Sequence, residues 1–141
     1  MTDQELVQRA LEMRNFSYAP YSHFAVGAAL LCEDGTVFTG CNVENAAYGS
    51  TICAERTALV KAVSEGRTTG WTTLAIAGSG ADFCWPCGAC RQMLYEFAPQ
   101  LRVLAVNEQG QFQQASLSEL LPMGFGPSSL NKIAFFAYSF H

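Results

Sequence analysis

The spacing of the cysteines constrains the fold of this chain more than any other feature. Cys87 and Cys90 are three residues apart and follow Pro86 directly. Proline suits the first turn of a helix, so the pattern predicts a helix that starts here with both sulfurs on one face. Metal ligation is favoured over disulfide bridges, because the polar, acidic N-terminal segment does not resemble a secretory signal.

A third sulfur precedes a carboxylate in Cys53-Ala54-Glu55, near the start of another predicted helix, 51–65. Two helix N-termini converging on one cation would bring three thiolates together and lower their pKa values. Zinc with three protein ligands keeps a fourth position for water, and a carboxylate beside it can accept and return the water proton. A carboxylate can also ligate metal; we favour the proton shuttle for Glu55.

Arg56 is the candidate for balancing charge at this site. Three thiolates and one Zn²⁺ sum to a charge of −1, which weakens the metal as a Lewis acid. Arg56 follows Glu55 and is placed to hydrogen-bond a ligand sulfur, although an exposed helix arginine is the alternative. Arg91, beside Cys90, is assigned to the same metal shell.

Helical and strand patterns alternate along the chain, which predicts an α/β domain with helices covering a sheet. Helices are predicted from a capping box at Thr2–Glu5 onward, over 51–65 and 87–97, and after a second capping box at Ser116–Glu119. Strands are predicted over 24–32, 36–41, 72–78 and 101–106, and 133–138 fits a strand or a helix. No repeat or linker interrupts the pattern, so we expect a single domain over 1–141.

Composition excludes some classes of function. The net charge is −4 and the eight basic residues are scattered, so there is no positive track for a polynucleotide. No apolar run approaches the roughly 20 residues that span a bilayer. Half of the residues are hydrophobic and 14% are charged, a balance that predicts buried subunit interfaces. We therefore expect a soluble, cytoplasmic oligomer that binds neither nucleic acid nor membrane.

Cys-x-Glu at 53–55 followed by Pro-Cys-x-x-Cys at 86–90 is the three-cysteine form of the zinc nucleobase deaminase signature. Further segments match in order over nearly the whole chain. They are Phe24–Ala28, Asn42–Ala46, Cys53–Arg56, Pro86–Gln92, Leu120–Pro122 and Phe125–Pro127. The chain resembles the small, homotetrameric cytidine deaminases.

That resemblance implies a three-layer α/β/α domain with a mixed sheet, and one Zn²⁺ per chain held by Cys53, Cys87 and Cys90. It implies hydrolytic deamination of cytidine and deoxycytidine to uridine and deoxyuridine plus ammonia, in pyrimidine salvage. A zinc-bound hydroxide would attack C4 while Glu55 moves the protons.

The resemblance also assigns substrate contacts. Phe24 would stack on the pyrimidine, Asn42 and Glu44 would bond the ribose 3′-hydroxyl, and Phe125 would enter a neighbouring subunit's site. Tyr48 is assigned an intersubunit contact. On residue type alone, Phe24 is a core aromatic, Asn42 and Glu44 are turn residues, and Phe125 is a loop aromatic.

Two alternatives remain open from the sequence. Phe83-Cys84-Trp85 departs from the family pattern, and Cys84 could join the other three sulfurs in a closed structural site without catalysis. A deaminase of an aminonucleoside antibiotic would share the zinc motif, although the segments around Asn42 and Phe125 favour cytidine.

Overall fold

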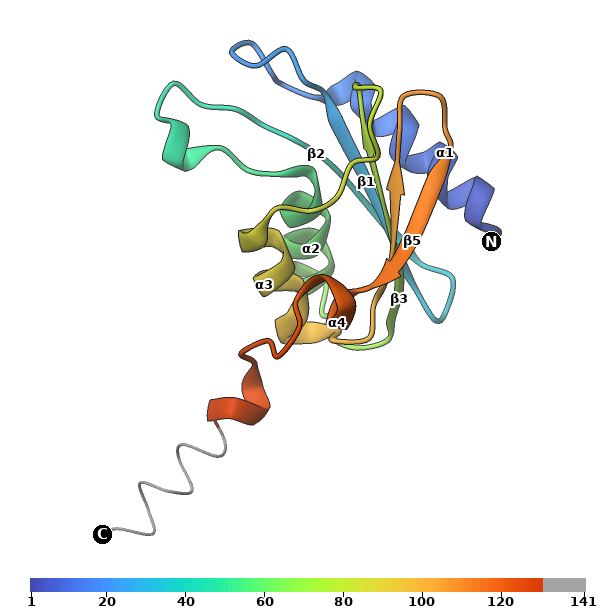
Figure 1. Ribbon diagram of the computed structural model, residues 1–141, viewed down its shortest axis with the longest axis vertical. Helices are drawn as coiled ribbons and strands as arrows, with labels where there is room; N and C mark the ends of the chain where they lie inside the picture. The colour runs from blue at the N-terminus through green and yellow to red at the C-terminus, as the bar shows by residue number, and fades with distance from the viewer. Residues whose placement is uncertain (131–141) are drawn as a thin grey trace, which may run out of the picture.

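The computed structural model describes residues 1–130, so the segment 133–138 lies outside the described residues. A mixed sheet of five strands in the order β2-β1-β3-β4-β5 runs through its centre (Figure 1). The strands are β1 (Val26–Cys32), β2 (Val37–Cys41), β3 (Trp71–Gly78), β4 (Arg102–Val106) and β5 (Phe112–Ser116). Among these five strands, only the β3–β4 pair is parallel.

Helices cover both faces of the sheet. Helix α1 (Asp3–Met13) packs on one face, and α2 (Ala54–Ser64), α3 (Gly88–Phe97) and α4 (Leu117–Leu120) lie on the other (Figure 1). Two short 3₁₀ turns, η1 (Arg14–Phe16) and η2 (Tyr48–Ser50), lie before β1 and before α2. The predicted three-layer α/β/α arrangement with a mixed sheet is confirmed. Within residues 1–130 no helix is long and apolar enough to cross a membrane.

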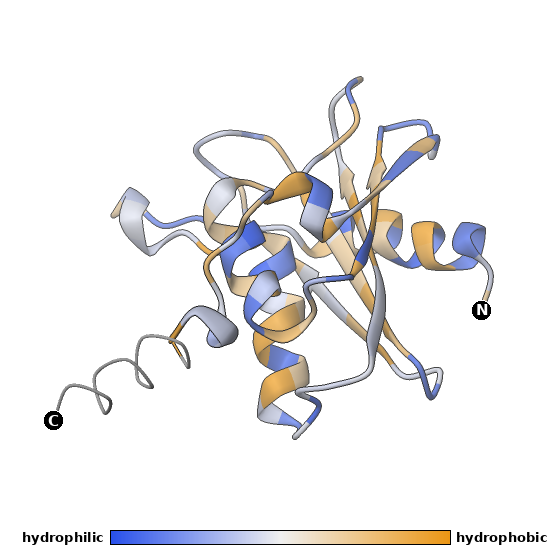
Figure 2. Cartoon of the chain, turned by 60° about the horizontal axis from the view of Figure 1, so that its bottom comes forward, coloured by the Kyte–Doolittle hydropathy of each residue, from blue (hydrophilic) through white to orange (hydrophobic). Residues whose placement is uncertain are grey.

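The core is divided by the sheet into two apolar clusters. In β3, Leu74 and Ile76 face α2 and α3, whereas Ala75 and Ala77 face α1. These alternating side chains are all fully buried, because both faces of β3 are covered. In Figure 2 the central strands are mostly hydrophobic, while hydrophobic and hydrophilic residues alternate along the helices.

The topology gathers several chain segments at one edge of the sheet. Strands β2 and β3 are both antiparallel to β1, so their carboxyl ends lie at the edge where β1 begins. Helix α2 is the next helix after β2, and α3 is the next after β3. Both helices therefore begin at this edge, which brings their N-termini together.

The sequence did not predict β5. Its exposed Gln113 and Gln114 lack the alternation of a half-buried strand, and its pairing with β4 is what makes this segment a strand. Helix α2 begins later than predicted, with Cys53 as its N-cap. Of the two predicted capping boxes, the one at Ser116 and Glu119 is complete. At the start of α1, Thr2 accepts a hydrogen bond from the Glu5 N–H at 3.1 Å, which is the N-cap half of the predicted box.

Gly27 tests the packing of α1 on the sheet, because a β-carbon there would lie 2.0 Å from the Ala10 carbonyl oxygen. Gly27→Ala is expected to lower the free energy of unfolding by about 1–3 kcal/mol, as overpacking does. Gly49→Ala is the control, since a β-carbon there meets no atom within 4 Å. Urea unfolding at one fixed protein concentration measures both; equal midpoints for the two variants would contradict the packing.

Candidate active site

Three cysteine sulfurs meet at the edge where α2 and α3 begin. The Sγ atoms of Cys53, Cys87 and Cys90 all lie within 4.8 Å of one another, and those of Cys87 and Cys90 are 3.4 Å apart. Sulfurs that share one tetrahedral zinc at about 2.3 Å each are separated by roughly 3.8 Å. The cluster therefore fits a single ion, and the donor set suits zinc.

The local structure explains how the sulfurs converge. Cys53 is the N-cap of α2 and Cys87 is the N-cap of α3, and neither side chain caps its own helix. Cys90 lies one turn further along α3 and is buried, whereas Cys87 is exposed. Three protein ligands leave the fourth position of a tetrahedral ion free for water or substrate, as a catalytic metal site requires.

The pKa values of the Cys53 and Cys90 thiols are shifted in opposite directions. Cys53 accepts a hydrogen bond from the Cys90 thiol, which together with Arg56 lowers the pKa of Cys53 to about 5. The same bond and burial raise the pKa of Cys90, which keeps its proton. The lowered pKa that the sequence predicts for the thiols is present at Cys53, where the neighbouring Cys90 sulfur is its largest cause, but not at Cys90. A bound cation would take the place of this shared proton.

Glu55 lies beside the sulfur cluster and is nearly inaccessible, with 5% of its surface exposed. Burial first, and then the charge on Cys53, raise the pKa of its carboxyl group. Among residues 1–130 the group of clustered ligand atoms contains only the three sulfurs, and no carboxylate oxygen. A buried carboxyl group with a raised pKa is suited to carrying protons near neutral pH.

The two arginines near the ligands have different partners. The Arg56 Nη2 atom lies 3.3 Å from the Cys53 sulfur and donates to it, as predicted. Arg91 donates to the Pro86 carbonyl at 2.7 Å and to the Leu120 carbonyl at 2.8 Å. Arg91 therefore does not bond a ligand sulfur, as its predicted place in the metal shell implied. It holds the backbone at Pro86 and Leu120 instead.

Cys84 is not a member of the sulfur cluster in the described part of the chain. It precedes Pro86, outside α3, and its β-carbon lies against Gly78 of β3. Burial and the nearby Glu55 carboxylate raise the pKa of its thiol to about 12. The arrangement thus has three sulfurs and lacks the fourth that a closed site would need.

Phe24 lies just before β1, at the same edge of the sheet. Its ring packs over Gly78 and Gly80, yet 42% of the residue is exposed. Phe24 is therefore a surface aromatic on a glycine platform and not a core residue, which leaves one ring face available for stacking.

Asn42 follows β2 and is buried with a nearly complete set of hydrogen bonds. Its oxygen accepts from the Val26 N–H at 2.9 Å and from the Ser17 hydroxyl, and its nitrogen donates to the Phe24 carbonyl at 2.8 Å. These partners fix the orientation of the amide. One of its two N–H groups remains available as a donor.

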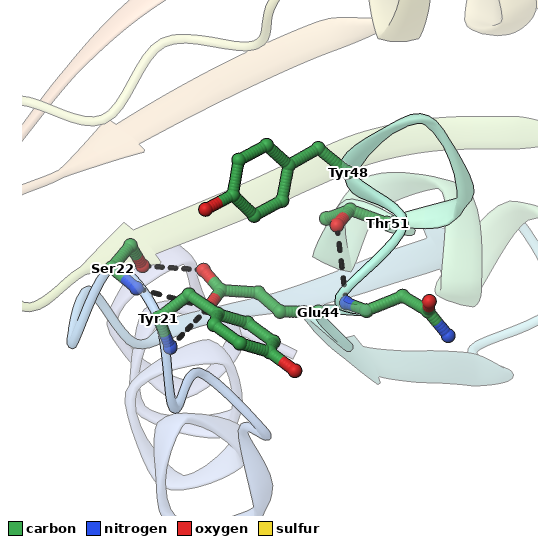
Figure 3. A pocket seen from close by; sticks show the side chains of 6 residues that line it. Tyr21, Ser22, Glu44, Tyr48 and Thr51 are labelled. Carbon is green, nitrogen blue, oxygen red and sulfur yellow. Dashed lines mark hydrogen bonds between the residues drawn. The ribbon is translucent and has the colours of Figure 1, made fainter.

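Glu44 reaches back to a turn that precedes β1. Its carboxylate accepts from the backbone N–H groups of Tyr21 and Ser22, both at 3.0 Å, and from the Ser22 hydroxyl. The Ser22 hydrogen bonds lower the pKa of Glu44. Figure 3 shows the carboxylate between the rings of Tyr21 and Tyr48, in a pocket of about 360 Å³. Sequence reasoning missed Tyr21 and Ser22, which a turn signal at Pro20 could have suggested.

Phe125 and Tyr48 lie on the surface. Phe125 is 53% exposed on the segment after α4, and Tyr48 is 76% exposed in η2. Tyr48 packs edge-on against Tyr21 with ring centroids 6.1 Å apart. Phe125 belongs to a segment on α3, away from the pocket formed by Tyr21 and Glu44.

Three clustered cysteine sulfurs next to a buried carboxyl group are the arrangement of the zinc-dependent nucleobase deaminases, and this protein is an enzyme of that class. Residues 1–106 match the family model described as the cytidine and deoxycytidylate deaminase zinc-binding region. The chain belongs to the cytidine and deoxycytidylate deaminase family.

Relatives and solved structures agree with this family. A cytidine deaminase of Halalkalibacterium halodurans is 47% identical over 132 residues, which cover 93% of this chain and 99% of that protein. One from Sporosarcina psychrophila is 42% identical over 135 residues, covering 95% and 98%. The crystal structure of a cytidine deaminase from Burkholderia pseudomallei has a TM-score of 0.86 at 46% identity, covering 89% of this chain and 100% of that one.

Cys90→Ser tests the ligand set against Cys84→Ser. Losing an outer-shell partner costs about 10–100-fold in metal affinity, so losing the Cys90 thiolate is expected to cost at least that much. Cys84→Ser is expected to keep its zinc, because this sulfur lies outside the cluster. The zinc content of both variants is measured after dialysis against a chelator. Equal losses of zinc from the two variants would support the alternative in which Cys84 is a fourth ligand.

Proposed function

We propose that this protein hydrolyses cytidine and deoxycytidine to uridine and deoxyuridine, releasing ammonia. The observation that carries the proposal is a buried carboxyl group, Glu55, beside three clustered sulfurs that leave one position of a tetrahedral ion free. The names of relatives that are 42–47% identical over most of the chain support this substrate. A role in pyrimidine salvage and a cytoplasmic location follow from the same proposal.

One Zn²⁺ per chain would be held by Cys53, Cys87 and Cys90. When bound, zinc lowers the pKa of a coordinated water toward about 7 and so supplies a hydroxide nucleophile at neutral pH. Arg56 reduces the negative charge of the three thiolates through its bond to the Cys53 sulfur.

Glu55 moves the protons of the reaction. It accepts the proton of the attacking water and delivers it to the ring nitrogen N3 as the water oxygen adds to C4. It then carries the hydroxyl proton to the 4-amino group, so that ammonia leaves and the C4 carbonyl forms. Burial raises the pKa of Glu55, so its carboxyl group can both hold and release a proton near neutral pH.

Three residues at the sheet edge would bind the nucleoside. Phe24 offers an exposed ring for stacking on the pyrimidine. The remaining N–H of Asn42 can donate to the ribose 3′-hydroxyl, and the Glu44 carboxylate can accept the proton of the same hydroxyl. The bonds that hold both side chains support this role, because they leave little freedom to lose on binding.

The active protein is proposed to be a homotetramer, in which Phe125 enters a neighbouring subunit's site and Tyr48 contacts another chain. Large exposed apolar side chains support this assembly, because a monomer would leave them in water. They include Phe16, Tyr18, Tyr48, Ile52, Met123 and Phe125.

Glu55→Gln tests the proton shuttle. The amide keeps the shape of the carboxyl group but cannot carry a proton, so turnover is expected to fall by about 10²–10⁴-fold with zinc content unchanged. Glu65→Gln, at the other end of α2, is the control and should turn over normally. The ultraviolet change on conversion of cytidine to uridine gives the rate; a Glu55→Gln rate near that of the unsubstituted protein would refute the shuttle.

Nucleosides, and not nucleotides, are the proposed substrates. The arginines near the site already have partners in the described chain: Arg56 bonds Cys53, Arg91 bonds two carbonyls, and Arg14 bonds the Gly78 carbonyl at 3.1 Å. The acidic Glu44 lines the adjacent pocket. A phosphate group would therefore find little positive charge here.

Cytidine and its 5′-monophosphate test this preference directly. We expect kcat/KM for cytidine to exceed that for the monophosphate by at least about tenfold, a difference of roughly 1.4 kcal/mol in transition-state binding. Both are measured at one ionic strength, because screening changes charge effects. Similar catalytic efficiency for the two compounds would count against the nucleoside assignment.

A further inference from the structure

The segment that carries Phe125 is held by two adjacent side chains of α3. The Arg91 Nη1 atom donates to the Leu120 carbonyl at 2.8 Å, and the Gln92 Nε2 atom donates to the Phe125 carbonyl at 2.7 Å. A carbonyl can only accept, so the orientation of the Gln92 amide is determined by this partner. One end of α4 and the segment after it are thus tied to α3.

Tyr95 lies one turn further along α3, and its ring packs against the same segment. A β-carbon on Gly124 would lie 3.0 Å from the Tyr95 Cζ atom, and one on Gly126 would lie 2.9 Å from its Cε1 atom. Glycine at these two positions allows a close approach, because a residue without a side chain lets the backbone lie directly on the ring. The backbone on both sides of Phe125 therefore packs closely on the Tyr95 ring.

The side chain of Phe125 is not fixed in the same way. It is 53% exposed although its backbone is held by Gln92 and flanked by glycines on the Tyr95 ring. A firmly held backbone under an exposed aromatic side chain lowers the entropy lost when that side chain meets its target. Helix α3 also carries Cys87 at its N-cap and Cys90 in its first turn, so one element supports both functions.

We propose that Gln92 and Tyr95 are positioning residues that hold the backbone of Phe125 so that its ring can cover the nucleoside in a neighbouring subunit. The inference rests on the proposed function for the role of Phe125. Gln92 acts through its amide donor and Tyr95 through its ring. Neither residue touches the reacting atoms or the metal ligands. Substitution of either residue should therefore weaken substrate binding and leave the metal in place.

A double-mutant cycle between Gln92→Ala and Phe125→Ala tests the proposal in the full-length, zinc-loaded protein. Gln92→Ala is expected to raise KM for cytidine by about threefold to tenfold, the range for one hydrogen bond, with kcat and zinc content unchanged. In the Phe125→Ala background the same substitution should have no further effect. Gln92→Glu keeps the shape of the side chain but replaces the amide donor with a carboxylate, which cannot donate to the Phe125 carbonyl. This variant should raise KM at least as much as Gln92→Ala.

Two further measurements separate positioning from general damage. Hydrogen exchange in a peptide covering 122–130 should be faster in Gln92→Ala than in the unsubstituted protein. Tyr95→Phe keeps the ring and should keep KM, whereas Tyr95→Ala should raise it. Glu96→Ala, an exposed substitution on the same helix, is the control for all kinetic changes.

The outcomes distinguish this inference from the proposed function. If Phe125→Ala raises KM but Gln92→Ala and Gln92→Glu do not, the positioning role is wrong and the role of Phe125 stands. Additive effects in the cycle would also overturn the positioning role. If the single variant Phe125→Ala leaves KM unchanged, Phe125 does not contribute to substrate binding. The proposed role of Phe125 is then wrong, and the positioning role of Gln92 and Tyr95, which depends on it, is wrong as well.

Discussion

The meeting of two helix N-termini at one edge of the sheet is the constraint on which the rest of this structure depends. Strands β2 and β3 run in the same direction, so α2 and α3 begin side by side. Cys53 and Cys87 occupy equivalent N-cap positions, and Cys90 completes the sulfur cluster from the first turn of α3. Glu55 is placed beside the cluster by the same geometry, because it lies in the first turn of α2.

The chain segments around this edge are joined by polar contacts that cross between elements. Asn42 links the end of β2 to the start of β1 and to the Phe24 carbonyl, while Glu44 holds the turn at Tyr21 and Ser22. Such contacts are made by groups that remain partly available for a ligand. The side chains that would bind a nucleoside are thus held in place before it arrives, which reduces the entropy cost of binding.

Helix α3 connects the metal centre with the surface. Its first turn holds two sulfurs, and its next turns hold the segment around Phe125 through Gln92 and Tyr95. Arg91 lies between these two regions and bonds backbone carbonyls at the start of α3 and the end of α4. A movement of α3 would therefore displace both the sulfur cluster and the exposed side chain of Phe125.

Local spacing in the sequence determined the Cys87–Cys90 pair, the place of Arg56 one helical turn after Cys53, the helix caps and the alternation of helices and strands, because each depends on residues close together in the chain. The approach of Cys53 to the other two sulfurs depends on the fold, which places the two helix N-termini side by side. Tertiary structure alone decided the rest. Strand β5 exists because β4 offers it a partner, Arg91 bonds Leu120 and not a sulfur, and Gln92 meets Phe125 across 33 positions. These contacts join residues far apart in sequence, where local propensity carries no information about which partners the fold brings within hydrogen-bonding distance.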